Sequence, residues 1–275
     1  MSQPTMPLTP LERLSGWALA VFCVLTAIFL IAPILAILPL GFSDGEFLVY
    51  PIREFSWKWM DAFFASDKWG VAVKNSFAIG AVSATLATVL GTMAAVGLSR
   101  QDFWGKKVIT GLVLSPLVVP IVIYAVGLYF FFAPLGLTQS YTGIVLAHAA
   151  LGSPFVVVTV GASLSNFDHN LMRAAASLGA SPLLAFRRVM LPLVLPGVVT
   201  GALFAFAASF DEVVTVLFLA APEQRTIPRE MFSGLRESLS PIIAAASTVM
   251  IVTAIVLLAA VEWLKRRTER MQKTA

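Results

Sequence analysis

Asp211 and Glu212 are adjacent carboxylates inside a long apolar run, in the stretch SFDEVV at residues 209–214. An ionised side chain among apolar residues is costly unless it faces a cavity or a partner, so both acids are candidate functional residues. A carboxylate binds an organic cation by charge pairing, and a neighbouring aromatic ring adds cation–π attraction. The alternative is a structural role, in which a basic side chain of a partner subunit neutralises the pair.

Helical geometry predicts which residues accompany Asp211. If residues 193–221 form one continuous span, Asp211 lies ~6 Å outward of its centre, at about 1.5 Å per residue. Consecutive helical residues point about 100° apart, so Glu212 does not fully share the face of Asp211. That face carries small residues and two phenyl rings: Phe204, Ala207, Ala208, Thr215 and Phe218. We therefore expect a substrate pathway that includes both acids, Phe204 and Phe218.

Tyr124 and His148 lie in two other apolar runs, at a depth that the predicted topology places near Asp211. We expect both side chains to line the same substrate pathway. The alternative for His148 is a hydrogen-bonded packing residue.

The sequence contains no pattern typical of an enzyme or a metal site. The phosphate-binding motif G-x-x-x-x-G-K-[ST] is absent, as are the H-E-x-x-H zinc motif and the G-x-S-x-G nucleophile motif. Cys23 is the single cysteine, which excludes an intrachain disulfide and a cysteine metal site. We predict no catalytic residue, metal site or cofactor in this chain, so any ATP hydrolysis must come from another chain.

Composition indicates a polytopic membrane protein of the all-α class. Of 275 residues, 58% are hydrophobic and 12% are charged, whereas soluble domains carry roughly 25% charged residues. The net charge of +4 accompanies no basic folded domain, so nucleic acid is not an expected partner. Crossing a bilayer takes roughly 20 apolar residues. Six runs qualify as transmembrane helices: residues 17–40, 73–98, 108–132, 142–164, 193–221 and 241–264.

Three stretches carry further structural signals. Residues 73–98 are dense in Gly, Ala, Ser and Thr, which predicts close helix packing. Pro116 and Pro120 predict a kink in the third span. Residues 42–72 are rich in Trp and Phe, as expected of a segment at the membrane interface. A substrate-binding aromatic box is the alternative for these residues.

Charge distribution orients the predicted spans. Six crossings place both termini on one side, and most of the 19 lysines and arginines lie there, including those of a basic tail at residues 265–275. Positive residues favour the cytoplasm, so we predict cytoplasmic termini. Residues 1–16 form a polar leader with a capping box, Thr9-Pro10-Leu11-Glu12, that begins the first helix. We expect residues 1–275 to form a single transmembrane domain.

The polar segment at residues 168–192, between the fourth and fifth runs, predicts two short helices joined by a hinge. Asp168 is a candidate N-cap for a helix that ends at Gly179, because glycine readily adopts the left-handed conformation. Ser181 followed by Pro182 predicts the start of a second helix, which continues until Pro192. The apolar side chains of both helices would be exposed unless a partner covered them.

This segment resembles the EAA loop of the permease subunits of bacterial ABC importers. The family pattern is Glu-Ala-Ala, three residues, Gly, nine residues and Ile-x-Leu-Pro. Five positions match at full spacing, Arg173 replaces the glutamate and Val189 replaces the isoleucine. The resemblance implies a type I ABC importer permease fold and a loop that docks on a cytoplasmic ATPase. The docking residues that it implies are Arg173, Ala174, Ala175, Gly179, Ser181, Leu191 and Pro192.

A second resemblance covers the chain from the third span to its end. SFDEVV, TIP at 226–228, MFS at 231–233, SP at 240–241 and AAAST at 244–248 are similar to the spermidine/putrescine importer permeases, as is PFVVV at 154–158. The likeness is to the second of their two membrane subunits and implies a small, cationic, nitrogen-containing solute. The alternatives are an opine, an amino acid or a betaine in the same importer class, or a proton-coupled secondary transporter.

These resemblances also imply partners and a location. The expected partners are a second homologous permease, two ATPase subunits that hold ATP and magnesium, an extracytoplasmic solute-binding protein and membrane lipid. The expected location is the bacterial cytoplasmic, or inner, membrane.

Overall fold

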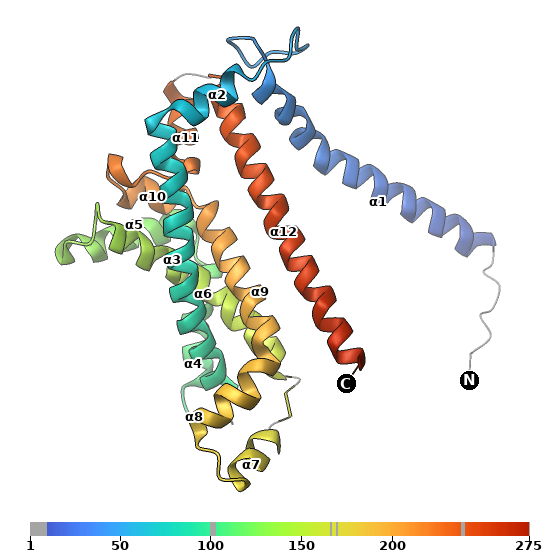
Figure 1. The fold of residues 1–275 in the computed structure, drawn as a ribbon, viewed down its shortest axis with the longest axis vertical. Helices are drawn as coiled ribbons and strands as arrows, with labels where there is room; N and C mark the ends of the chain where they lie inside the picture. Colours follow the sequence, from blue (N-terminus) through green and yellow to red (C-terminus); the bar gives the residue numbers. More distant parts are fainter. Residues whose placement is uncertain (1–9, 100–102, 166, 169, 238–239, 275) are drawn as a thin grey trace. The chain divides into compact units, whose positions relative to one another are not determined.

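The computed structural model describes residues 10–99, 103–165, 167–168, 170–237 and 240–274, which form helices and no named strand (Figure 1). The α-helices are α1 (Pro10–Ile37), α2 (Lys58–Ala65), α3 (Asp67–Leu98), α4 (Lys106–Leu114), α5 (Ile121–Phe132), α6 (Tyr141–Ser165), α7 (Asn170–Ser177), α8 (Pro182–Ala185), α9 (Leu191–Phe210), α10 (Val214–Leu219), α11 (Ile227–Glu237) and α12 (Ile242–Thr274). Four short 3₁₀-helical turns lie between them among the described residues: η1 (Leu38–Phe42), η2 (Ser115–Leu117), η3 (Ala133–Leu135) and η5 (Pro222–Gln224). A π-helical turn, η4 (Phe186–Met190), lies between α8 and α9. The predicted cap Thr9 lies outside the described residues, and α1 begins at the next position.

Five helical segments are long and apolar enough to cross a membrane: Leu14–Phe42, Asp67–Leu98, Tyr141–Ser165, Pro182–Phe210 and Ile242–Trp263. They correspond to five of the predicted spans, which confirms the polytopic all-α class. The second span begins earlier than predicted. Ser66 explains this difference, because its side chain caps α3 by accepting a hydrogen bond from the Trp69 backbone N–H at 3.5 Å.

The third predicted span, residues 108–132, is broken rather than kinked. The helical segments Lys106–Leu117 and Ile121–Leu135 bend by 106° relative to each other. Pro120 lies directly before the second segment with φ −55° and ψ 130°, outside the helical region. Because proline also lacks a backbone N–H, it cannot continue the hydrogen-bond ladder from the first segment.

The fifth predicted span, residues 193–221, is wrong as one continuous helix. α9 ends at Phe210, and the six-residue helix α10 begins at Val214. At its other end α9 continues through η4 into α8, so the membrane-length helix begins at Pro182. Asp211 therefore lies at a helix end. The predicted face that it shared with Thr215 and Phe218 does not exist, because those two residues belong to α10.

The helices α3, α6 and α9 pack against one another in a unit that comprises residues 63–238 and 252–275. Small side chains allow the helices to approach closely, as predicted for residues 73–98. A Cβ atom on Gly91 of α3 would lie 2.7 Å from Val156 Cβ, and one on Gly201 of α9 would lie 2.9 Å from Val156 Cα. Only glycine fits at these two positions, so the backbones of α3 and α9 both contact the same residue of α6.

A second unit comprises residues 1–62 and 239–251. Its irregular stretch, residues 43–57, is held by an antiparallel bridge between Ser43 and Phe55 and by the Trp59 indole, which donates to the Gly45 oxygen at 2.8 Å. Aromatic rings of this stretch remain largely exposed, among them those of Phe47, Phe55 and Trp57. Exposed aromatic rings are typical of a segment at the membrane interface.

Within the first unit, α11 and the segment 168–190 lie at opposite ends of α3 (Figure 1). The N–H of Ile227, the first residue of α11, donates to Ser76 near the N-terminus of α3 at 2.8 Å. Near the C-terminus of α3, Ala95 shares a core with Phe167 and Met190. The sequence selected two regions: the acids Asp211 and Glu212, and residues 168–192. We call the interruption at residues 211–213 the break and residues 168–192 the EAA-like loop, and both belong to this one helical bundle.

Candidate functional site

Asp211 lies in a break between two helices. Its backbone N–H donates to the Ala207 oxygen at 3.1 Å, and its φ of −90° and ψ of −4° lie in the bridge region, where α9 stops. Its side chain is exposed, although apolar residues of α9 and α10 flank it in sequence. An exposed carboxylate in this position can accept charge-assisted hydrogen bonds from an ammonium group.

Glu212 makes a different contact. Its Oε1 accepts a hydrogen bond from the backbone N–H of Thr215 at 2.7 Å. In a continuous helix that N–H would bond to the Asp211 oxygen, so the carboxylate replaces a helical hydrogen bond and stabilises the break. Its negative charge also lies at the N-terminal end of α10, which favours anions. The two adjacent acids are thus separated into one exposed carboxylate and one bound to the backbone.

His148 is buried next to the break. It lies on α6 with 1% of its surface exposed, and its Nδ1 lies 2.7 Å from the hydroxyl of Ser209 near the end of α9. Its Nε2 has no hydrogen-bond partner among the described residues. The histidine therefore connects α6 to the last turn of α9 and presents almost no surface to a solute.

Tyr124 reaches the same stretch of α6 from α5. Its hydroxyl donates to the oxygen of Ala147 at 2.8 Å. Because Ala147 directly precedes His148, the structure gathers the predicted polar residues of three spans around the break.

Phe204 and Phe218 lie on either side of the break in sequence and are partly exposed, by 39% and 41%. Phe204 pairs with Phe155 of α6, with ring centroids 6.5 Å apart. The two rings belong to different helices, so they do not form the single face predicted for them. Their exposure leaves both rings available to an apolar or cationic group.

The EAA-like loop folds into the two predicted helices joined at Gly179. The first helix, α7, ends in a Schellman motif: Gly179 has φ +82° and donates to the Ala176 oxygen at 2.9 Å, and Ala180 donates to the Ala175 oxygen at 3.0 Å. A Cβ atom at position 179 would meet nothing within 4 Å. The requirement for glycine is therefore conformational, not a matter of space.

Ser181 caps α8 as predicted, and Asp168 bonds to the first residue of α7. The Asp168 carboxylate accepts the N–H of Asn170 at 2.9 Å, and the Ser181 hydroxyl accepts the N–H of Leu184 at 3.4 Å. Arg173, which replaces the family glutamate, donates to the Asn170 side chain at 2.5 Å. Local contacts therefore define the shape of the loop.

One side of the loop is anchored and the other is exposed. Met172, Phe186 and Val189 pack against the core of the bundle. The exposed leucines are Leu178 (88%), Leu183 (67%), Leu171 (43%) and Leu184 (40%). Of the docking residues implied by the resemblance, Arg173, Ala174, Gly179, Ser181 and Pro192 are exposed, and Ala175 and Leu191 are half-buried. An anchored segment that exposes leucines is typical of a protein-binding surface.

The second helix of the loop does not end at Pro192 as predicted. The chain passes from α8 through η4, a π-helical turn, directly into α9. The N–H of Leu191 donates to the Phe186 oxygen, five residues earlier, where an α-helix would use the fourth. This wider turn changes the hydrogen-bond register next to Pro192, so the proline, which lacks an N–H, enters the helix without terminating it.

Two buried polar residues, one next to the break and one on α3, were not selected from the sequence. Ser209 is the partner of His148, and Asn75 of α3 is 4% exposed and bonds to the segment after α10. A lone asparagine within an apolar run is the signal that would have indicated Asn75, because buried amides need partners.

The fold and the two motifs agree with comparisons to known proteins. Residues 87–270 match the family described as binding-protein-dependent transport system inner membrane component. The chain is 31% identical over 239 residues to the spermidine/putrescine transport system permease protein PotC of Haemophilus influenzae, covering 87% of this chain and 93% of PotC. It is 32% identical over 266 residues to the putrescine transport system permease protein PotI of Escherichia coli, covering 94% of each.

The fold is similar to that of a chain from a bacterial ABC transporter involved in the import of the acidic polysaccharide alginate. The TM-score is 0.72 at 16% identity, over 94% of this chain and 99% of that one. The resemblance to importer permeases seen in residues 168–192 and 209–248 is therefore confirmed across most of the chain. The chain belongs to the family of inner membrane components of binding-protein-dependent transport systems.

Proposed function

We propose that the chain is a permease subunit of an ATP-driven importer for a small cationic, nitrogen-containing solute of the spermidine/putrescine class. The observation that carries the proposal is Asp211, an exposed carboxylate at a helix break inside an apolar stretch. A carboxylate in such a place is stable only if it faces water or an opposite charge. Relatives named for spermidine and putrescine transport support the choice of an ammonium group as that charge.

The remaining pathway residues have distinct proposed roles around Asp211. Phe204 and Phe218, both partly exposed, contact the aliphatic or ammonium groups of the solute. Glu212 holds the N-terminus of α10 through the hydrogen bond that its carboxylate accepts from the Thr215 N–H. Tyr124 and His148 act through their contacts to α6 and Ser209, because their hydrogen bonds are directed into the protein.

The exposed leucines of residues 171–184 form the surface that docks on a cytoplasmic ATPase subunit. This assignment rests on their exposure and on the anchoring of the opposite side of the loop. ATP and magnesium are then bound by two such ATPase subunits and not by this chain. A second homologous permease completes the pathway, a solute-binding protein delivers the solute at the outer side, and both termini lie in the cytoplasm.

Transport then couples two events in one bundle. Closure of the ATPase pair moves the docking loop, and α9 transmits the movement to the break at Asp211. A solute favours one state of the pathway over the other only if its affinity for the two differs. The contact between Asp211 and the solute provides that difference, because the carboxylate lies at the break where α9 ends and α10 begins.

Uptake of radiolabelled spermidine and putrescine tests the proposal, in cells that express the complete transporter with or without this subunit. We expect uptake that depends on the subunit, is blocked by excess unlabelled polyamine and by vanadate, and persists when the proton gradient is collapsed. Uptake of an opine, an amino acid or a betaine in place of polyamine would contradict the substrate class. Loss of uptake with the proton gradient would contradict the ATP-driven mechanism.

A further inference from the structure

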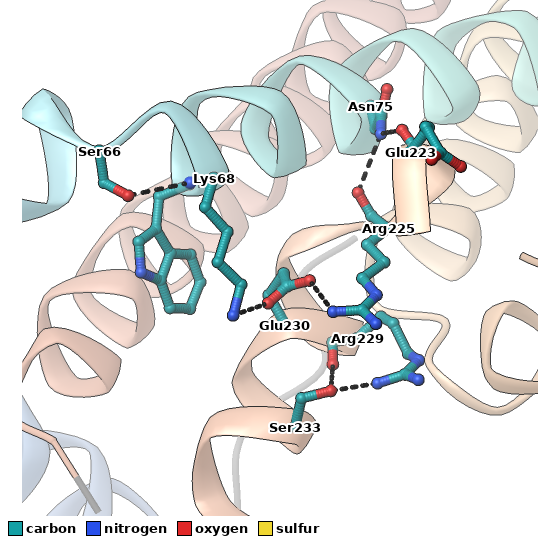
Figure 2. Close-up of polar contacts among 9 residues, drawn as sticks. Ser66, Lys68, Asn75, Glu223, Arg225, Arg229, Glu230 and Ser233 are labelled. Carbon is teal, nitrogen blue, oxygen red and sulfur yellow. Dashed lines mark hydrogen bonds and ion pairs between the residues drawn. The ribbon is translucent and has the colours of Figure 1, made fainter. Parts of the chain in front are cut away.

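Polar side chains of two helices hold the segment that follows α10. Asn75 of α3 donates through Nδ2 to the backbone oxygens of Glu223 and Arg225, at 2.8 and 3.0 Å (Figure 2). The hydroxyl of Tyr141, the first residue of α6, lies 2.9 Å from the Glu223 oxygen and 3.1 Å from Asn75 Oδ1. We call residues 219–227 the anchored loop, because α3 and α6 both bond to its backbone.

Both ends of the anchored loop are also fixed. At its start, the oxygen of Leu219 accepts the backbone N–H of Gln139 at 2.7 Å. At its end, the N–H of Ile227 donates to the buried hydroxyl of Ser76 at 2.8 Å. These partners lie far away in sequence, so the bundle sets the path of the loop together with one contact inside it, in which Gln224 Oε1 accepts the Ala221 N–H at 2.8 Å.

Two ion pairs to one buried carboxylate hold the helix that comes next, and their cations reach the surface: Lys68 is 54% exposed and Arg225 is 32% exposed. Glu230 of α11 is 2% exposed, and its two carboxylate oxygens lie 2.7 Å from Lys68 Nζ and 3.0 Å from Arg225 Nη1 (Figure 2). Removing either cation would leave part of a buried negative charge uncompensated. α11 is therefore held on the N-terminal end of α3, and Arg225 is fixed by both its backbone and its side chain.

The anchored loop continues directly from α10, the six-residue helix that begins after the break. A helix of this length is marginal by itself, so its position depends on what holds its two ends. Glu212 holds the first end and the anchored loop holds the second. Between them, Val216 and Leu219 are completely buried against Ile79 and Ile144, which leaves α10 little freedom to move independently.

We infer that Asn75 and Tyr141 are positioning residues for transport: they fix the far end of α10 and thereby the geometry of the break that carries Asp211. The inference rests on the substrate role proposed for Asp211, which neither residue contacts through its hydrogen bonds. If the inference is correct, the N-terminal ends of α3 and α6, which carry Asn75 and Tyr141, influence the affinity for the solute.

The chemistry of position 75 is specific to an amide. The buried side chain uses Nδ2 as a donor to two carbonyl oxygens and Oδ1 as an acceptor. Asn75→Asp keeps the size of the side chain but directs a negative oxygen at those two carbonyls. Tyr141→Phe is milder, because it removes one hydroxyl from a residue that is 47% exposed.

The test measures how fast a thiol reagent labels a cysteine at the break, and it needs no substrate. A thiol reporter at the break, Val213→Cys, is introduced into the complete transporter with Cys23→Ser, which removes the native thiol, and is labelled in membranes by a thiol reagent. We expect Asn75→Asp to raise the labelling rate roughly tenfold and Tyr141→Phe to raise it less, because lost hydrogen bonds free the end of α10. The same substitutions in the Val213 protein should raise the KM for polyamine uptake more than they lower its maximal rate.

Tyr129→Phe is the matched control, because it removes a hydroxyl from a partly exposed tyrosine of α5, and it should leave labelling and KM unchanged. Should Asn75→Asp reduce the amount of protein in the membrane, Tyr141→Phe carries the test. Unchanged labelling and KM in Tyr141→Phe, at normal abundance, would overturn the inference. Because labelling needs no substrate, a labelling response combined with a normal KM in Asp211→Asn would contradict the role of Asp211 while retaining the anchor.

Discussion

The EAA-like loop and the break at Asp211 are built in opposite ways on the same bundle. In the loop, side-chain hydrogen bonds join residues two to four positions apart, and leucines are exposed. Around the break and the anchored loop, several bonds join residues 61 to 151 positions apart through buried side chains such as His148 and Asn75, in addition to the local bond between Glu212 and Thr215. The loop thus has a locally determined shape with surface left for a partner, whereas the break depends on the whole bundle.

This difference predicts that substitutions at the break change how the solute is handled, whereas substitutions in the loop change partner binding. The largest effect is expected for Asp211→Asn. Losing a charge-assisted hydrogen bond to an ammonium group should raise the KM for polyamine uptake by about 10- to 100-fold. The control is Asp61→Asn, which alters an exposed carboxylate of α2. Equal KM values for the two variants would mean that Asp211 does not bind the solute and has a structural role.

A somewhat smaller effect is expected for Gly179→Val in the loop. A β-branched residue at φ +82° is strained by about 1–2 kcal/mol, so co-purification with the ATPase should weaken by roughly 5- to 30-fold. Gly179→Asn should largely restore association, because asparagine tolerates the left-handed conformation. If both variants bound the ATPase normally, the Schellman turn would have no part in docking.

Removing one exposed leucine should have a more modest effect. Leu178→Ser should weaken ATPase association by roughly fivefold, as expected when an apolar contact is lost. The thermal midpoint of the purified protein should not change, because Leu178 is 88% exposed. Leu235→Ser, at the other end of the bundle on α11, is the matched control, and a similar loss of association there would show that the effect is not specific to the loop.

The smallest effect is expected for Glu212→Gln, which removes the negative charge of the side chain but keeps its ability to cap α10. Glutamine can still accept the N–H of Thr215, so the KM for uptake should change by no more than about twofold. Glu212→Ala removes the cap, which typically costs about 1 kcal/mol, and should raise the KM by roughly fivefold. A large change in Glu212→Gln would instead mean that this carboxylate contacts the solute directly.

Sequence alone predicted the turn and the helix starts of the EAA-like loop because their signals are local. Gly179 marks the left-handed turn, and Ser181 with Pro182 marks the next helix start, so each feature follows from neighbouring residues. The break at residues 211–213 contains neither glycine nor proline. The break is stabilised by the Glu212 cap and by the bond between Ser209 and His148. Ser209 and His148 lie 61 positions apart, so no local pattern reveals that they are partners.

The third span shows the same limit. Pro116 and Pro120 predicted a distortion, but not a bend of 106°. The direction of α5 after the bend depends on its packing against α10, a helix that the continuous fifth span did not predict. Asn75 could have been selected as a lone asparagine in an apolar run, but its backbone partners could not be predicted, because they lie 148 and 150 positions later in the chain.

The π-helical turn between α8 and α9 has a mechanical consequence. It makes Pro182–Phe210 a single helical segment of 29 residues that joins the EAA-like loop to the break. Figure 1 shows that the segment changes direction between α8 and α9, as expected at a π-helical turn followed by Pro192. The loop and the break are therefore joined by one bent helical segment and not by two helices with an irregular linker between them. In the importer that we propose, the angle at residues 186–190 would set the direction in which a movement of the docking loop reaches Asp211.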